Sequence, residues 1–172
     1  FLFAMATYMW IVKQPAGNAK MTGIAGLIES GSMTFLKKEY TILIGFLAVV
    51  AILLGTKLGT NTAIAYIAGA LISMLCGFIG MKAATKANVR TAEAAAQSGQ
   101  AKALSVAFYG GSVMGMTVAS LGLIGIVVAY KYLTGSTIEA LNGFAMGASS
   151  IALFARVGGG IYTKAADVGA DL

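Results

Sequence analysis

Long runs without a charged residue constrain this chain more than any other feature. Residues 103–130 contain no Asp, Glu, Lys or Arg, and the same is true of residues 62–81. A helix needs about 20 mainly apolar residues to cross the ~30 Å hydrocarbon core of a bilayer. Only 10% of the 172 residues are charged and 58% are hydrophobic, whereas about 25% of the residues in an ordinary soluble domain are charged. The sequence therefore predicts an all-α, polytopic transmembrane helix bundle.

Turn signals divide the chain into five predicted helices. Pro15 and Gly17 interrupt the first, Asn18 is a suitable N-cap for the second, and Ser98 and Gly99 separate two later helices. We expect one bundle with spans at residues 1–12, 20–57, 62–97, 100–131 and 137–172. The first span is about half the length that crosses a bilayer, and the last stops inside a charged motif. We therefore expect the chain to be part of a larger protein.

Basic residues lie mainly on one side of this alternation of spans. Only Lys57 and Lys131 fall on the other side. The richer side carries Lys13, Lys20, Lys37, Lys38, Lys82, Lys86, Arg90 and Lys102. Because cytoplasmic loops are enriched in Lys and Arg, we expect this side to face the cytoplasm. The net charge of +6 is spread between apolar spans rather than gathered in one patch, so no nucleic-acid partner is indicated.

Several familiar functional motifs are missing from the sequence. It has no histidine, which excludes a Ser-His-Asp triad within the chain, and its one cysteine excludes an intramolecular disulfide. No glycine-rich nucleotide loop is present. The basic segment 82–93 is most simply interpreted as a helical extension that anchors to anionic lipid at the membrane surface.

The last predicted helix carries its charges along one side. At about 100° per residue, Arg156, Lys164, Asp167 and Asp171 fall within an arc of about 80°, in a stripe about 22 Å long. Charges at membrane depth cost about 2.5–3.5 kcal/mol each and by default indicate function. A lysine beside two carboxylates suits a phosphate bound with Mg²⁺, because the ammonium attracts the anion and the carboxylate oxygens bind the metal. The spacing alone equally allows a salt-bridge ladder on the helix surface.

Glycine runs accompany this helix. The run 158–160 costs about 1 kcal/mol per glycine relative to alanine, so close helix contact or approach of a ligand must offset it. The pair Gly143 and Gly147, like the pair Gly111 and Gly115, has the spacing of close helix contacts in membranes.

Arg156 lies about 12 Å deeper along the helix than Lys164. A buried carboxylate on another helix is its expected partner. We expect no acid of this chain at that depth, since Glu139 lies at the opposite end of the same helix. The partner of Arg156 is therefore expected on helices outside this chain.

Residues 156–172 read R-V-G-G-G-I-Y-T-K-A-A-D-V-G-A-D-L. This segment resembles the hallmark motif of the membrane-integral inorganic pyrophosphatases, ion-pumping enzymes with sixteen transmembrane helices per subunit. Residues 35–40, 80–92 and 99–108 are also similar to segments of that family. The resemblance implies that the chain is the N-terminal portion of such a subunit, about five helices of the sixteen, and that its last helix is the fifth.

The resemblance also implies roles for the charged stripe. Lys164 is expected to contact pyrophosphate. Asp167 and Asp171 are expected to act as catalytic residues that bind the metal–pyrophosphate complex and help to place the attacking water. Arg156 is expected to belong to the ion-coupling layer. The implied cofactor is Mg²⁺, with K⁺ and Na⁺ as candidates, and the implied assembly is a homodimer in a prokaryotic cell membrane with its active site facing the cytoplasm.

The transported ion and two other functions remain open at this point. Sodium is the first expectation for the ion and a proton the alternative, because no residue here decides between them. A non-catalytic ion-conducting bundle usually relies on a mid-span carboxylate, which this sequence lacks. A purely structural membrane subunit would leave the charged stripe and the glycine run unexplained. We therefore expect an ion-translocating diphosphatase, and we expect the 172-residue piece alone to be inactive because it lacks most of the metal ligands.

Overall fold

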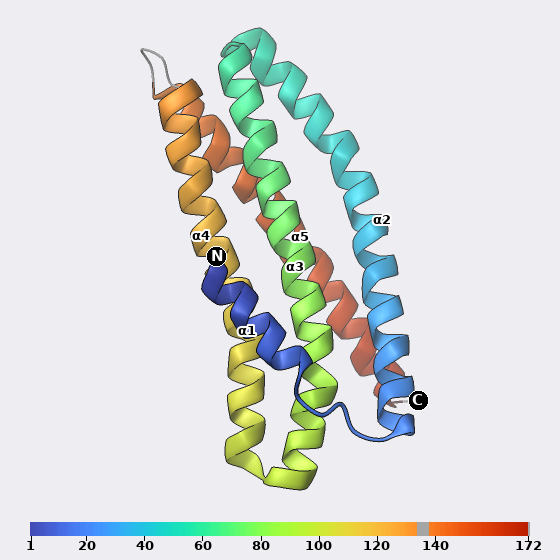
Figure 1. The fold of residues 1–172 in the computed structure, drawn as a ribbon. Coiled ribbons are helices and arrows are strands. Elements are labelled where there is room, and N and C mark those ends of the chain that lie inside the picture. Colours follow the sequence, from blue (N-terminus) through green and yellow to red (C-terminus); the bar gives the residue numbers. More distant parts are fainter. Residues whose placement is uncertain (134–137, 172) are drawn as a thin grey trace. The chain divides into compact units, whose positions relative to one another are not determined.

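The computed structural model describes residues 1–133 and 138–171, which form five helices and the segments between them (Figure 1). The helices are α1 (Leu2–Val12), α2 (Ala19–Lys57), α3 (Thr60–Ser98), α4 (Gln100–Leu133) and α5 (Glu139–Asp171). The described residues contain no strand, which confirms the prediction of an all-α fold. The observed helix ends lie within two residues of the predicted ranges. The expected first and last residues of the fifth range, Thr137 and Leu172, fall outside the described residues.

The helix ends follow from residues that cap or break a helix. The Oδ1 atom of Asn18 accepts a hydrogen bond from the N–H of Met21 at 3.0 Å, so Asn18 is the N-cap of α2 as predicted. Three turns place a glycine at positive φ: Gly17 at 83°, Gly59 at 100° and Gly99 at 82°. A residue with a Cβ atom is strained in this left-handed region, so glycine allows each of these turns between helices.

Helices α2, α3, α4 and α5 are each long and apolar enough to cross a membrane. Helix α1 is shorter, with 11 residues. Helices α2 and α3 have 39 residues each, or about 58 Å at 1.5 Å per residue. Because this exceeds the ~30 Å hydrocarbon core, their polar ends extend beyond it. The chain is part of a multi-pass membrane protein.

The first of two compact units comprises Phe1–Thr34 and Cys76–Leu121. Within it, α1 lies against α3 and α4 (Figure 1). Ile11 of α1 is fully buried against Ala83, Ala87 and Val113. Small alanines on α3 let the larger apolar side chains of its neighbours approach closely, as expected for helices that pack in a membrane.

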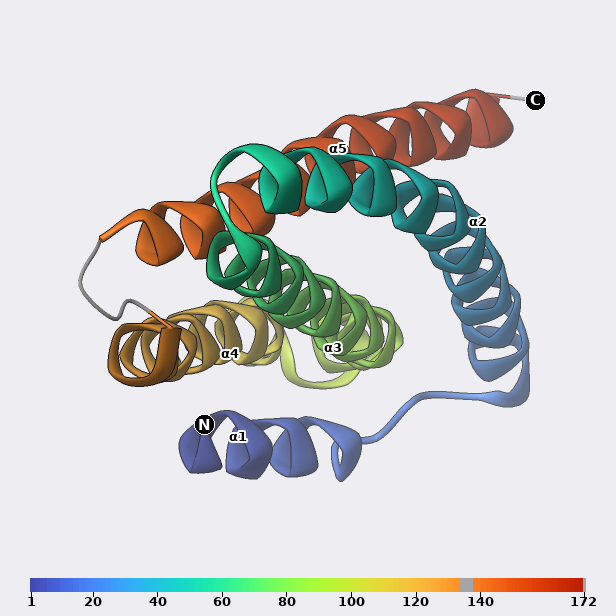
Figure 2. The same cartoon turned by 90° about the horizontal axis from the view of Figure 1, so that it is seen from above.

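The second unit comprises Phe35–Leu75 and Gly122–Leu172. Within it, α5 packs along α2 and α3 (Figure 2), where Ile151 joins a buried cluster with Leu43, Leu47 and Tyr66. A Cβ atom at Gly147 would overlap the backbone carbonyl of Tyr66. This contact is closed to any larger residue at that position.

The two predicted glycine pairs differ in their surroundings. A Cβ atom at Gly143 would come within 2.6 Å of the Thr62 carbonyl oxygen, and Gly147 is as close to α3, so the prediction of close contact at this pair is confirmed. At Gly111 and Gly115 a Cβ atom would meet no atom of the described chain within 4 Å. Close contact at this second pair stays a prediction.

Candidate functional site

The four charged residues predicted from the sequence all lie on the second half of α5 with exposed side chains. The Lys164 Nζ and Asp167 Oδ2 atoms are 3.8 Å apart, and these side chains are 78% and 67% exposed. Asp171 follows Asp167 by one helical turn, and Arg156 precedes Lys164 by about two. Among the described residues, neither Arg156 nor Asp171 forms an ion pair. The structure thus brings Lys164 and Asp167 together and places the other two on the same side.

The Lys164–Asp167 ion pair contributes little to the stability of the fold. Exposed ion pairs contribute about 0–1 kcal/mol, because water screens the attraction and two long side chains must be held in place. At 3.8 Å the pair is also longer than a charge-assisted hydrogen bond, which is about 2.7–2.9 Å. Both groups therefore remain available to a stronger partner.

Helix α5 has two opposite faces. One face packs within the second unit through Gly147, Ile151, Gly158 and Tyr162, which recur at four- and seven-residue intervals. At about 100° per residue, the arc centred on Arg156, Lys164, Asp167 and Asp171 lies roughly on the other side of the helix. The packed face holds α5 in place, and the charged residues of the other face are exposed in the described part of the chain.

The glycine run 158–160 contains residues of both the packed and the charged side of α5. A Cβ atom at Gly158 would overlap the Oε1 atom of Glu39 and lie 3.1 Å from the tip of the Phe35 ring, so this glycine permits close helix contact. At Gly159 and Gly160 a Cβ atom would meet nothing within 4 Å in the described chain. Gly160 lies on the charged side of α5, where the absence of a side chain leaves the backbone open to a ligand or another helix.

Sequence reasoning missed Glu39. The expectation that no acid of this chain lies at the depth of Arg156 is wrong, because Glu39 contacts Gly158, only two residues along α5. It lies on the packed face, roughly opposite Arg156, and the structure records no ion pair between them. A signal was present, since Glu39 precedes the buried residues Leu43 and Leu47 at four-residue intervals and so shares their helix face.

The donor atoms on the charged face fit part of a magnesium site. Among the described residues, no group of three or more His, Cys, Asp or Glu could hold a metal ion. Asp167 and Asp171, one turn apart, present two carboxylates on one side of α5. Mg²⁺ is commonly held by one or two carboxylates together with water and substrate phosphates. The pair therefore fits a shared metal–phosphate site, with further ligands from outside the described chain.

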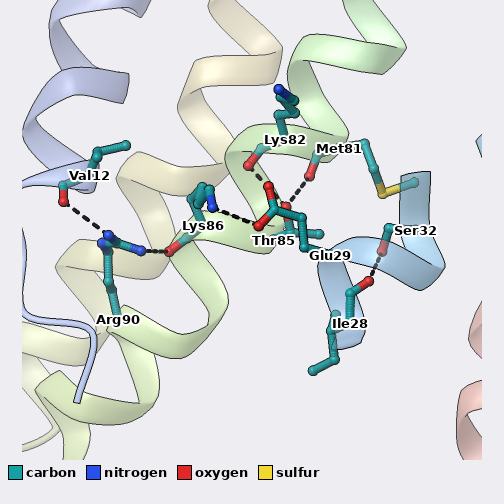
Figure 3. A network of polar contacts seen from close by, with 9 residues as sticks. All are labelled: Val12, Ile28, Glu29, Ser32, Met81, Lys82, Thr85, Lys86 and Arg90. Atoms are coloured by element: carbon teal, nitrogen blue, oxygen red, sulfur yellow. Dashed lines mark hydrogen bonds and ion pairs between the residues drawn. The ribbon is translucent and has the colours of Figure 1, made fainter. Parts of the chain in front are cut away.

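A separate polar cluster in the first unit uses its charges internally. Lys86 Nζ is 2.6 Å from Glu29 Oε2, and Arg90 donates hydrogen bonds to the carbonyl oxygens of Lys86 at 2.9 Å and Val12 at 3.0 Å. Figure 3 shows these groups directed toward one another from α1, α2 and α3. Two basic residues of the segment 82–93 thus have partners within the chain, and anchoring of this segment to lipid stays a prediction.

The fold and the charged helix define a class: a multi-pass membrane protein that presents a lysine and two carboxylates at one end of a span. Comparison of the sequence with protein families gives a more specific result. The family model described as "Inorganic H+ pyrophosphatase" matches residues 1–172, the full length of the chain. The chain therefore belongs to this family, as its motifs predicted.

Curated relatives include pumps for two different ions. A Clostridium tetani protein, 56% identical over 99% of this chain, carries the provisional name of a K⁺-stimulated pyrophosphate-energized sodium pump. A Moorella thermoacetica protein, 44% identical over 98% of the chain, is named a K⁺-insensitive pyrophosphate-energized proton pump. A Thermotoga maritima protein, 40% identical over 99%, is named a K⁺-stimulated pyrophosphate-energized sodium pump. The chain spans 25% of the first protein and 26% of each of the other two.

Proposed function

We propose that this chain contributes the charged end of α5 to an ion-pumping inorganic pyrophosphatase, in which hydrolysis of pyrophosphate drives a cation across the membrane. The observation that carries the proposal is the exposed row of Lys164, Asp167 and Asp171 on the face of α5 that the second unit leaves uncovered. Membership of the pyrophosphatase family along all 172 residues supports it.

Each charged residue has a distinct role in this proposal. The Lys164 ammonium binds a phosphate oxygen of pyrophosphate as a compact point charge. Asp167 and Asp171 are the catalytic carboxylates, which bind the metal–pyrophosphate complex and help to hold a water molecule in line with one phosphorus. Arg156 lies about 12 Å deeper along α5 and belongs to the ion-coupling layer, where its partners come from helices outside the chain.

The metal in this proposal is Mg²⁺, held in part by Asp167 and Asp171. When bound, it neutralises charge on the pyrophosphate and makes phosphorus more susceptible to attack. The protein residues supply what the metal does not: the lysine fixes one end of the substrate, and the carboxylates restrict the orientation of the water. Orientation of reacting groups is itself a large part of catalysis.

The transported ion is proposed to be Na⁺, with H⁺ as the alternative. The support is a 56% identity to the Clostridium tetani protein, whose provisional name is a sodium pump, against 44% to the Moorella proton pump. On the same basis K⁺ is proposed to stimulate activity. Uptake of ²²Na⁺ into vesicles on addition of pyrophosphate, insensitive to a protonophore, is expected for a sodium pump. Acidification of vesicles without sodium would contradict this choice.

The assembly and its location are proposed from the family resemblance and the charge pattern. The five helices form a single bundle within a larger subunit, the subunits pair as a homodimer, and the charged end of α5 faces the cytoplasm of a prokaryotic cell. The excess of basic residues near that side of the spans supports this orientation. Labelling of a cysteine introduced at Ala170 by a membrane-impermeant thiol reagent in inside-out vesicles tests it.

Phosphate release from pyrophosphate tests the proposed site directly. The full-length protein in membranes is assayed with Mg²⁺, and Lys164→Ala and Asp167→Ala are compared with Lys131→Ala, an exposed lysine on another helix. Both site variants are expected to lose hydrolysis while the control keeps it. Unchanged hydrolysis in both site variants would contradict the assignment of the site to Lys164 and Asp167, whereas absence of hydrolysis in the unmodified protein would favour a non-catalytic ion-conducting or structural bundle.

A further inference from the structure

Two side chains of α2 contact the packed face of α5 just before its charged end. The rings of Phe35 and Tyr162 have centroids 5.1 Å apart, inclined by 38°. One turn further along α2, Glu39 lies against Gly158, one turn before Tyr162 on α5. All four residues belong to the second unit. They form a pair of adjacent contacts, one aromatic and one between a carboxylate and a glycine backbone.

The contact at Gly158 has no spare room. A Cβ atom there would overlap Glu39 Oε1, which is the end of a flexible side chain, and would lie 3.1 Å from the Phe35 ring, closer than most side-chain contacts. Oε1 is buried and has no hydrogen-bond partner among the described residues. A buried polar oxygen without a partner costs free energy, so this packing is maintained against a penalty. A larger residue at position 158 would have to displace the Glu39 carboxyl group from this position.

The contact is placed to influence the charged end of the helix. Gly158 lies six residues before Lys164, about 9 Å along the axis, and Tyr162 lies only two residues before it. The charges point roughly the other way from the contact. Glu39 and Phe35 therefore do not contact the ligand of Lys164. They contact the opposite face of the helix segment that carries Lys164.

We propose that Phe35 and Glu39 form a seat for α5 that fixes the position and rotation of Lys164, Asp167 and Asp171. Both are positioning residues, acting through the α5 backbone rather than on the substrate. This inference rests on the proposed function, since it assigns the seat to a pyrophosphate site. A misplacement of about 1 Å by a remote change can cost about 100-fold in rate. A Cβ atom at position 158, which would displace the Glu39 carboxyl group, is therefore expected to weaken substrate binding.

Gly158→Ala is the principal test, in the full-length protein in membranes. It is expected to raise the KM for magnesium pyrophosphate by about tenfold, because misplaced ligands bind and orient the substrate less well. Gly45→Ala is the matched control, since it makes the same substitution on α2 where a Cβ atom would meet no described atom within 4 Å. A variant that only lowers the amount of folded protein lowers the maximal rate and leaves KM unchanged.

Two substitutions of Glu39 distinguish the effect of its side-chain shape from the effect of its negative charge. Glu39→Ala is expected to raise KM, because it leaves a gap behind α5, and Glu39→Gln is expected to restore most of the affinity, because it keeps the shape. A Gln variant as impaired as the Ala variant would overturn the seat in favour of a role for the negative charge.

A double-mutant cycle tests the contact itself. Removal of the Glu39 side chain makes room for a Cβ atom at position 158, so the KM increase from Gly158→Ala is expected to be smaller in the Glu39→Ala background. Fully additive effects would overturn the seat, since residues in contact couple and independent ones do not.

The two proposals fail in different ways. If Lys164→Ala and Asp167→Ala leave hydrolysis intact, the site assignment is wrong. If these variants abolish hydrolysis but Gly158→Ala behaves like Gly45→Ala, the site stands and the seat is wrong.

Discussion

Two clusters of charged residues in this chain differ in how closely they are paired within the fold. In the first unit, Glu29 and Lys86 form an ion pair at 2.6 Å, and Arg90 donates to two backbone carbonyls. In the second, the charges of α5 are exposed, and the Lys164–Asp167 pair is 3.8 Å long. The partly buried charges of the first unit thus have partners within the fold. Exposed charges are stable in water without a partner, so those of α5 stay accessible to the pyrophosphate that we propose they bind.

The largest difference between the clusters is expected in catalysis. Asp167→Ala removes a carboxylate that the proposed site needs, and we expect hydrolysis to fall by about 100-fold or more, as when one group that stabilises charge in a transition state is lost. Rates of phosphate release from magnesium pyrophosphate in membranes measure it. Glu29→Ala, which removes a carboxylate of the internal cluster, is expected to keep hydrolysis within a few-fold, and equal losses in the two variants would erase the distinction.

A second expectation concerns the packed face of α5, which carries the charged face. Gly147→Ala places a methyl group on the backbone carbonyl of Tyr66, and backbone cannot move aside as a flexible side chain does. We expect a loss of about 1–3 kcal/mol or more in stability, typical of overpacking, seen as a lower midpoint of thermal unfolding for the purified protein. Gly45→Ala, in open space, should change this midpoint little or raise it.

The ion pair of the first unit is expected to have a small effect. Its side chains are 36% and 29% exposed, so water and salt screen it, and Glu29→Gln should cost about 1 kcal/mol or less. The unfolding midpoint should drop less than in Gly147→Ala, and high salt should narrow the gap to wild type. A gap that grows with salt would show that Coulomb attraction is not what this pair contributes.

The smallest expected effect is at Lys102, whose ammonium lies 5.2 Å from the centroid of the Trp10 ring. Exposed cation–π contacts contribute about 0.5–1 kcal/mol, and Lys102→Ala should lose that amount of stability without altering the KM for pyrophosphate. Lys102→Arg keeps a cation over the ring and serves as the control. If the Arg variant were as destabilised as the Ala variant, the cation would not be the source of the effect.

Helix positions were predictable because local signals mark them. The cap at Asn18, the positive-φ glycines at positions 17 and 99, and the uncharged run 103–130 act within a few residues or by simple length. The one-sided arrangement of the α5 charges is equally local, since it follows from helical periodicity.

Contacts between helices were less predictable, because spacing does not say which neighbour a face meets. Gly143 and Gly147 contact α3 closely, whereas Gly111 and Gly115, with the same spacing, meet no described atom within 4 Å. Glu39 looks like part of a solvated charged segment beside Lys37 and Lys38. Only the packing of α2 on α5 shows that its carboxylate reaches the back of Gly158.

Binding of a non-hydrolysable diphosphate to the full-length protein tests the central claim most directly, because it separates recognition from turnover. With Mg²⁺ present, wild type and Glu29→Gln are expected to bind it with similar affinity, while Lys164→Ala and Asp167→Ala bind it at least about tenfold more weakly, a loss of about 1.4 kcal/mol. Equal affinity in all four proteins would contradict the assignment of the charged face of α5 to pyrophosphate.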